Sequence, residues 1–137
     1  MSRAVETSPI LPDLLRRVTE SDEVRRLAEE VRAGSRVVSV GGLTSGAARA
    51  LAVAALRRET GRRFAVIVQS CRDLEAWERD LCFWHDALRR DARAGHDDED
   101  DAVLTLPASE GDPYAGSSPH AETLERRALS LWRLARG

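Results

Sequence analysis

A chain of 137 residues with 42% hydrophobic and 32% charged residues has the length and composition of one domain that buries a core. Its formal net charge of −2 offers no overall attraction to nucleic acid or to an acidic membrane surface. The sequence contains no apolar run of membrane-spanning length, and its first nine residues lack the apolar stretch of a secretion signal, so we expect no membrane partner and a cytoplasmic location.

The first predicted element is helix over about residues 11–35, in one piece or two. Ser21 is a candidate N-cap, and Asp22 and Glu23 follow it in the first turn, where acidic side chains suit the helix dipole. Gly34 is a good helix terminator. We therefore divide the chain into an N-terminal helical segment, 1–35, and a domain spanning 36–137.

Short β-branched or apolar runs predict strands over 36–40, 64–69 and 103–107. Helices are expected over about 45–59, closed by Gly61, over 70–90, and after Ser118 and Pro119 as N-cap and first helical residue. This alternation predicts an α/β fold, a parallel β-sheet with flanking helices.

Two of these helices carry apolar residues at helical spacing, which favours burial against a core; for the helix over 70–90, a cofactor site is the less favoured alternative. In the helix over 70–90 they are Leu74, Trp77, Leu81, Trp84 and Leu88; in the last helix they are Ala121, Leu124, Ala128, Leu131 and Ala135.

Between the two helices, the acidic run 97–101 indicates a mobile, solvated loop over about 90–101, with a divalent-cation site as the alternative.

Candidate metal ligands are few. Cys82 and His85 lie three residues apart and could share one face of a helix, but two ligands do not make a site, so we expect packing and no metal. Cys71 and Cys82 are too few for a disulfide framework. All 21 basic residues are arginine, so the chain has no lysine for phosphate binding or Schiff-base chemistry.

The glycine turn after the first predicted strand has the outline of a P-loop, G-x-x-x-x-G-K-[ST]. Gly41 and Gly46 have the required spacing, but Ala47 and Ala48 replace the lysine and the hydroxyl residue. The lost charge-assisted hydrogen bonds contribute on the order of 1.5–3 kcal/mol each, so a nucleotide triphosphate should bind weakly or not at all. We expect no catalytic residue and no cofactor, and at most a weak anion site at this degenerate loop, which comprises Gly41, Gly42, Thr44, Ser45, Gly46, Ala47 and Ala48.

The order and spacing of several short motifs resemble the amino-terminal region of bacterial transcription-repair coupling factor, over about residues 36–134. The pieces that carry the resemblance are Gly42-Leu43-Thr44, Pro107 followed by Asp112-Pro113-Tyr114, and Ser118-Pro119 leading into Glu125-Arg126 and Leu134. The resemblance implies the first part of a module similar to excinuclease B, the damage-verifying helicase of nucleotide excision repair. Such a module would be a partial RecA- or helicase-like domain whose nucleotide site has degenerated.

The resemblance also implies a role. The whole family protein is an ATP-dependent DNA translocase that binds stalled RNA polymerase and double-stranded DNA and recruits excinuclease A, with its motor far downstream. A chain like this one would be a non-catalytic module that packs against neighbouring domains and regulates partner binding. Excinuclease B itself fits less well, because it has an intact P-loop and an aromatic-rich hairpin, whereas only Tyr114 and Trp132 are aromatic after Pro107.

Two other functions stay open. One is a small nucleotide- or phosphate-binding α/β protein in which Arg49 contacts the phosphate, with Asp73, Glu75 and Glu110 as acids that no spacing distinguishes from surface carboxylates. The other is a DNA-binding module that uses arginine pairs, against which acidic residues are interspersed. These pairs are Arg57-Arg58, Arg62-Arg63 and Arg126-Arg127.

Overall fold

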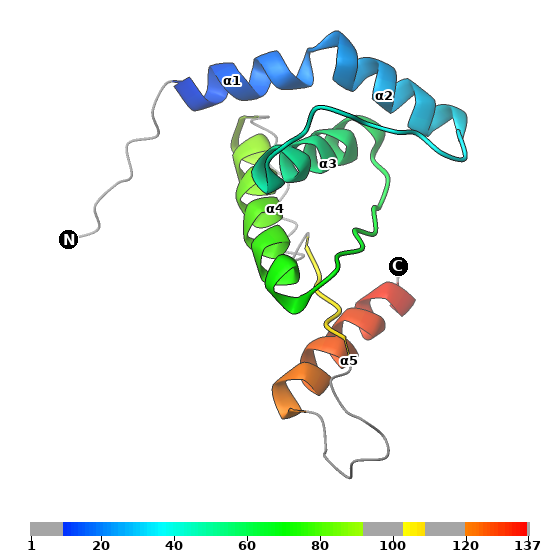
Figure 1. Cartoon of the computed structure of the whole chain (residues 1–137), viewed down its shortest axis with the longest axis vertical. Coiled ribbons are helices and arrows are strands. Elements are labelled where there is room, and N and C mark those ends of the chain that lie inside the picture. Colours follow the sequence, from blue (N-terminus) through cyan, green and yellow to red (C-terminus); the bar gives the residue numbers. More distant parts are fainter. Residues whose placement is uncertain (1–9, 92–102, 109–119, 137) are drawn as a thin grey trace, which may run out of the picture.

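The computed structural model describes residues 10–91, 103–108 and 120–136. These ranges contain five helices, and within 10–91 the first four are joined by turns and by extended or irregular chain (Figure 1). The helices are α1 (Ile10–Thr19), α2 (Asp22–Ala33), α3 (Gly46–Thr60), α4 (Cys71–Asp91) and α5 (Ala121–Arg136). None of the helices in the described ranges is both long and apolar enough to cross a membrane.

The predicted N-terminal helix is confirmed, and it forms two pieces. The hydroxyl of Ser21 caps α2 by accepting a hydrogen bond from the Val24 N–H at 3.3 Å. Gly34 ends α2 in the left-handed conformation, with φ 79°, and its N–H bonds back to the last turn. These local signals fix both ends of α2, as the sequence indicates.

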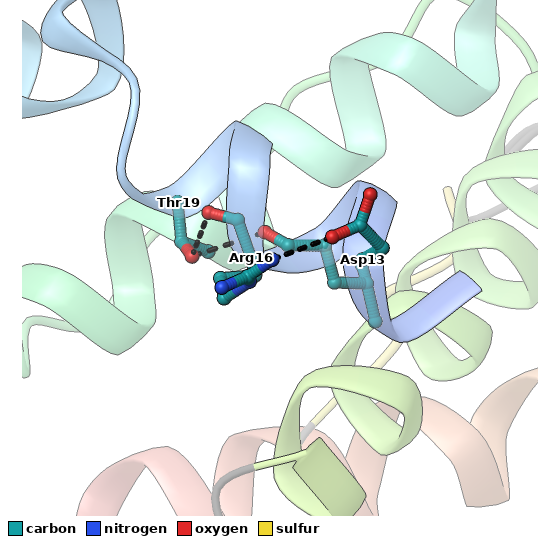
Figure 2. Close-up of polar contacts among 4 residues, drawn as sticks. Asp13, Arg16 and Thr19 are labelled. Carbon is teal, nitrogen blue, oxygen red and sulfur yellow. Dashed lines mark hydrogen bonds and ion pairs between the residues drawn. The ribbon is translucent and has the colours of Figure 1, made fainter. Parts of the chain in front are cut away.

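Figure 2 shows polar contacts of α1 that lie within the helix itself. Arg16 pairs with Asp13 at 2.6 Å, and both side chains are more than half exposed. The hydroxyl of Thr19 donates to the carbonyls of Leu15 and Arg16, at 3.0 and 3.1 Å, at the end of the helix. Since an exposed ion pair of this kind contributes at most about 1 kcal/mol, the position of α1 depends on its apolar contacts.

The core forms where α1 and α4 meet α3. Leu15 of α1, Ala54 of α3 and Leu88 of α4 are buried together, and Leu11, Leu51, Trp84 and Ala87 pack around them. Ala50 and Ala55 of α3 are fully buried. The small side chains of α3 allow its neighbours to approach its backbone closely, which raises the density of van der Waals contacts. This packing also covers the apolar seam predicted for α4, of which Leu88 is buried and the other four members are half-buried.

The predicted α/β fold with a parallel sheet is wrong for the described residues, which contain no strand. The segments 36–40, 64–69 and 103–107 are non-helical, but no backbone hydrogen bond joins them to one another in the described ranges. Val37 and Ile67, which a central strand would bury, are 81% and 96% exposed. Local β-branched character favours extended backbone, but a strand also needs a neighbouring ladder, and here the helices bury apolar surface against one another instead.

The last helix, α5, packs against the segment 103–108 and against none of the other described helices. The buried Ser130 hydroxyl donates to the carbonyl of Thr105 at 2.6 Å, and Arg127 donates to the carbonyl of Pro107. The apolar face predicted to be buried is not buried at any of its five positions, so that prediction is wrong for the described part of the chain. The predicted cap, Ser118 and Pro119, and the whole acidic run 97–101 lie outside the described residues. Of the loop predicted over about 90–101, only residues 90 and 91 are described, and they belong to α4.

Candidate functional site

The glycine turn lies between the extended segment 36–40 and the first turn of α3, where a P-loop would place a phosphate. Ser45 is the N-cap of α3, and its hydroxyl accepts a hydrogen bond from the Ala48 N–H at 3.1 Å. Its carbonyl accepts the Arg49 N–H at 3.2 Å. In a P-loop, free N–H groups at this end of the helix point at the phosphate. Here the serine itself takes up one of those donors.

A carboxylate also lies close to this end of α3. A β-carbon on Gly46 would lie 3.9 Å from the Oδ2 of Asp80, a residue of α4 whose side chain is 23% exposed. The positive end of the helix dipole favours a carboxylate at this place. Arg79 forms an exposed ion pair with Asp80 at 3.4 Å, so the negative charge that opposes a phosphate group there is only partly balanced.

Arg49, the residue weighed as a substitute for the P-loop lysine, turns back to the loop backbone. Its Nε donates to the carbonyl of Leu43 at 3.0 Å. Arg49 also lines a hollow of about 460 Å³ beside the turn, whose other walls are mostly apolar: Leu27 of α2, Ala52, Val53 and Leu56 of α3, Trp77 of α4, and Val40, Gly42 and Leu43. With a single guanidinium, this hollow suits an apolar group better than a triphosphate.

Gly41 and Gly42 of the turn differ in backbone conformation. Gly42 has φ 83°, whereas Gly41 has an ordinary φ, and a β-carbon on either would meet open space. We expect Gly42→Ala to lower the free energy of unfolding by about 1 kcal/mol, because alanine resists the left-handed conformation. Gly41→Ala is the matched control and should be neutral or stabilising by up to about 1 kcal/mol. Urea denaturation of both variants tests this, and equal losses would show that the turn is not held in this conformation.

Of the predicted turn residues, Ser45 acts as the cap of α3, and Gly46 begins the helix. Gly41, Thr44 and Ala47 are exposed, and Ala48 is half-buried in the first turn of α3. Sequence reasoning missed Asp80, which lies 34 positions beyond Gly46. Asp80 follows Trp77, a member of the apolar seam of α4, by three residues, so the two lie on neighbouring parts of the helix surface. This spacing is the one sequence signal that could have placed Asp80 near α3.

The other predicted sites are not assembled in the described ranges. Cys82 is exposed and His85 is half-buried, and no group of three or more potential metal ligands converges in residues 10–91, 103–108 and 120–136. Of the arginine pairs weighed for DNA binding, Arg62 donates to the carbonyls of Val31 and Arg32 at 2.6 and 3.2 Å. Arg127 likewise donates to the carbonyl of Pro107. Two of the three arginine pairs therefore each have one member bonded to the backbone.

The pKa of His85 is clearly perturbed. Burial lowers it below 6.5, the charges of Arg57 and Arg89 lower it further, and the neighbouring Asp86 opposes them. The unfolded chain therefore binds a proton at this position more readily than the folded protein does. We expect the free energy of unfolding to fall as pH drops from 6.5 through the folded pKa of His85, and His85→Gln to remove this part of the pH dependence. Denaturation midpoints of both proteins between about pH 7.5 and 5 check it; identical slopes would exclude His85 as the source.

Comparison with protein-family models, with curated proteins and with solved structures finds no match to this chain. The grounds for its function therefore lie in its own residues.

Proposed function

We propose that this chain is a non-catalytic protein-interaction module, in the role that its resemblance to the amino-terminal region of transcription-repair coupling factor implies. Its partners would be neighbouring domains of such a protein. RNA polymerase, excinuclease A and double-stranded DNA would be partners of the whole protein. ATP-driven translocation would belong to that protein's motor and not to this chain.

The exposed apolar face of α5 carries the proposal. Residues 124, 128, 131 and 135 recur at the spacing of a helix face made for burial, yet no described part of the chain buries them. Leu131 is 51% exposed, and the other large apolar side chains of α5 are comparably open: Leu124, Leu129, Trp132 and Leu134. Leu124, Ala128, Leu131 and Ala135 share one face of α5, and an exposed apolar helix face of this kind is typical of a protein-binding site.

The geometry of the turn before α3 weighs against the alternative function, a nucleotide-binding protein. The cap by Ser45, the carboxylate of Asp80 and the inward bond of Arg49 leave this turn poorly suited to a phosphate. The alternative of a nucleotide-binding protein therefore gains no support from its geometry.

The test measures binding between this chain and a bacterial coupling factor that lacks its own amino-terminal module. Biolayer interferometry should detect saturable binding, and Leu131→Asp should weaken it at least about tenfold, because a charge would enter the apolar contact. Leu14→Asp is the matched control. Leu14 is 44% exposed on α1, away from α5, and its replacement should leave the affinity unchanged (Figure 1).

Circular dichroism of both variants shows whether they keep their helices. If Leu131→Asp remains folded and binds as tightly as the unchanged chain, α5 is not the contact surface. Absence of any binding by the unchanged chain would overturn the proposal itself.

A further inference from the structure

A second hollow, remote from the glycine turn, lies between the carboxyl-terminal halves of α3 and α4. Its volume is about 240 Å³, and seven residues line it: Ala54, Arg57, Arg58, Gly61, His85, Leu88 and Arg89. Three of the seven are arginines and a fourth is a histidine. Ala54 and Leu88, both members of the buried core, also line it. The hollow thus combines buried apolar side chains with basic ones.

The described part of the chain provides little to neutralise the charge of Arg57 and Arg89. No carboxylate in residues 10–91, 103–108 and 120–136 forms an ion pair with either of them. Asp86 lies 3.9 Å from the Nδ1 of His85, but it is not among the lining residues. Arg57 and Arg89 thus line the hollow without a carboxylate partner in the described residues, and each guanidinium can donate two hydrogen bonds to one oxyanion.

His85 lines the same hollow, and the charges around it act on its imidazole. The charges of Arg57 on α3 and of Arg89 on α4 both lower its pKa, so both are close enough to act on the imidazole. An anion held between the arginines would offset their charge and favour the imidazolium.

We propose that this hollow, which we call the α3–α4 basic pocket, binds a small phosphate-bearing anion through Arg57 and Arg89, with His85 as an additional donor when protonated. A phosphate group offers several acceptor oxygens, which two guanidinium forks can share. Since the pocket is open and one of its walls is the negative end of α3, we expect an affinity in the millimolar range. The site is independent of the proposed protein contact on α5.

The experiment follows the C2 proton of His85 by NMR while inorganic phosphate is added to the whole chain, with sodium chloride as the reference at matched ionic strength. Phosphate should raise the pKa of His85 in a saturable way, beyond the rise that chloride produces by screening. By linkage, phosphate should also bind more tightly as pH falls through the pKa of His85.

Variants assign the contact. Arg57→Gln and Arg89→Gln should each weaken phosphate binding about tenfold, because each removes a charge-assisted hydrogen bond. Arg72→Gln is the matched control, since Arg72 is exposed at the opposite end of α4 and should leave binding unchanged.

Two results would overturn the proposal. One is an identical response to phosphate and to chloride, which would mean that the arginines only balance the α3 dipole. The other is equal binding of acetate, which would assign the pocket to carboxylates. Weakened binding in Arg57→Gln and Arg89→Gln, with Arg72→Gln unchanged, supports it.

Discussion

Replacing Leu15 by alanine is expected to lower the free energy of unfolding by about 3 kcal/mol, within the range of about 2–5 kcal/mol for a buried leucine. Leu15 is 2% exposed and joins α1 to Ala54 of α3 and Leu88 of α4. Its truncation leaves a cavity at the point where three helices meet, and the exposed ion pair within α1 contributes too little to compensate. Urea denaturation followed by circular dichroism measures the loss.

The neighbouring residue supplies a matched control. Leu14 is 44% exposed on the same helix, so Leu14→Ala should change the free energy of unfolding by no more than about 0.5 kcal/mol. A loss for Leu14→Ala equal to that for Leu15→Ala would place the other face of α1 in the core and contradict this packing.

Ala55→Glu is expected to lower the free energy of unfolding by about 3 kcal/mol or more. If the unchanged chain is only marginally stable, this loss prevents folding. Ala55 is 0% exposed on α3, against which α4 and α2 pack, so a carboxylate there would be buried without a partner. Glutamate is itself a good helix former, and the loss would therefore report burial and not helix propensity.

Ala47→Glu makes the same substitution at an exposed position of the same helix. There it should change the free energy of unfolding by no more than about 0.5 kcal/mol, since Ala47 is exposed. If Ala55→Glu proved as stable as Ala47→Glu, the buried face of α3 would be wrongly placed.

The helices could be predicted from the sequence because their signals are local. Ser21 and Gly34 bound α2, and Gly61 closes α3, through hydrogen bonds that reach no more than about one helical turn. The apolar seam of α4 likewise follows from spacing alone. Such features depend on a few adjacent residues and not on what the rest of the chain does.

Strand pairing and the environment of the glycine turn could not be predicted in this way. Val37 and Ile67 have the side chains of a buried strand, but a sheet depends on distant segments meeting, and in the described residues they do not. Asp80 approaches Gly46 only because α4 packs on α3. Local spacing identified the missing P-loop residues, but it could not show which charge lies beside the turn.

The turn before α3 caps a helix, and we propose that it holds no nucleotide. The most direct test is a titration of the ¹⁵N-labelled chain with magnesium and ATP, observed at the amides of residues 41–48. We expect no saturable shift of these amides up to about millimolar ATP, because the lysine and hydroxyl contacts of a P-loop are missing and Ser45 takes the Ala48 N–H. Saturable, magnesium-dependent shifts at Gly41, Gly42 and Gly46 with micromolar affinity would contradict it.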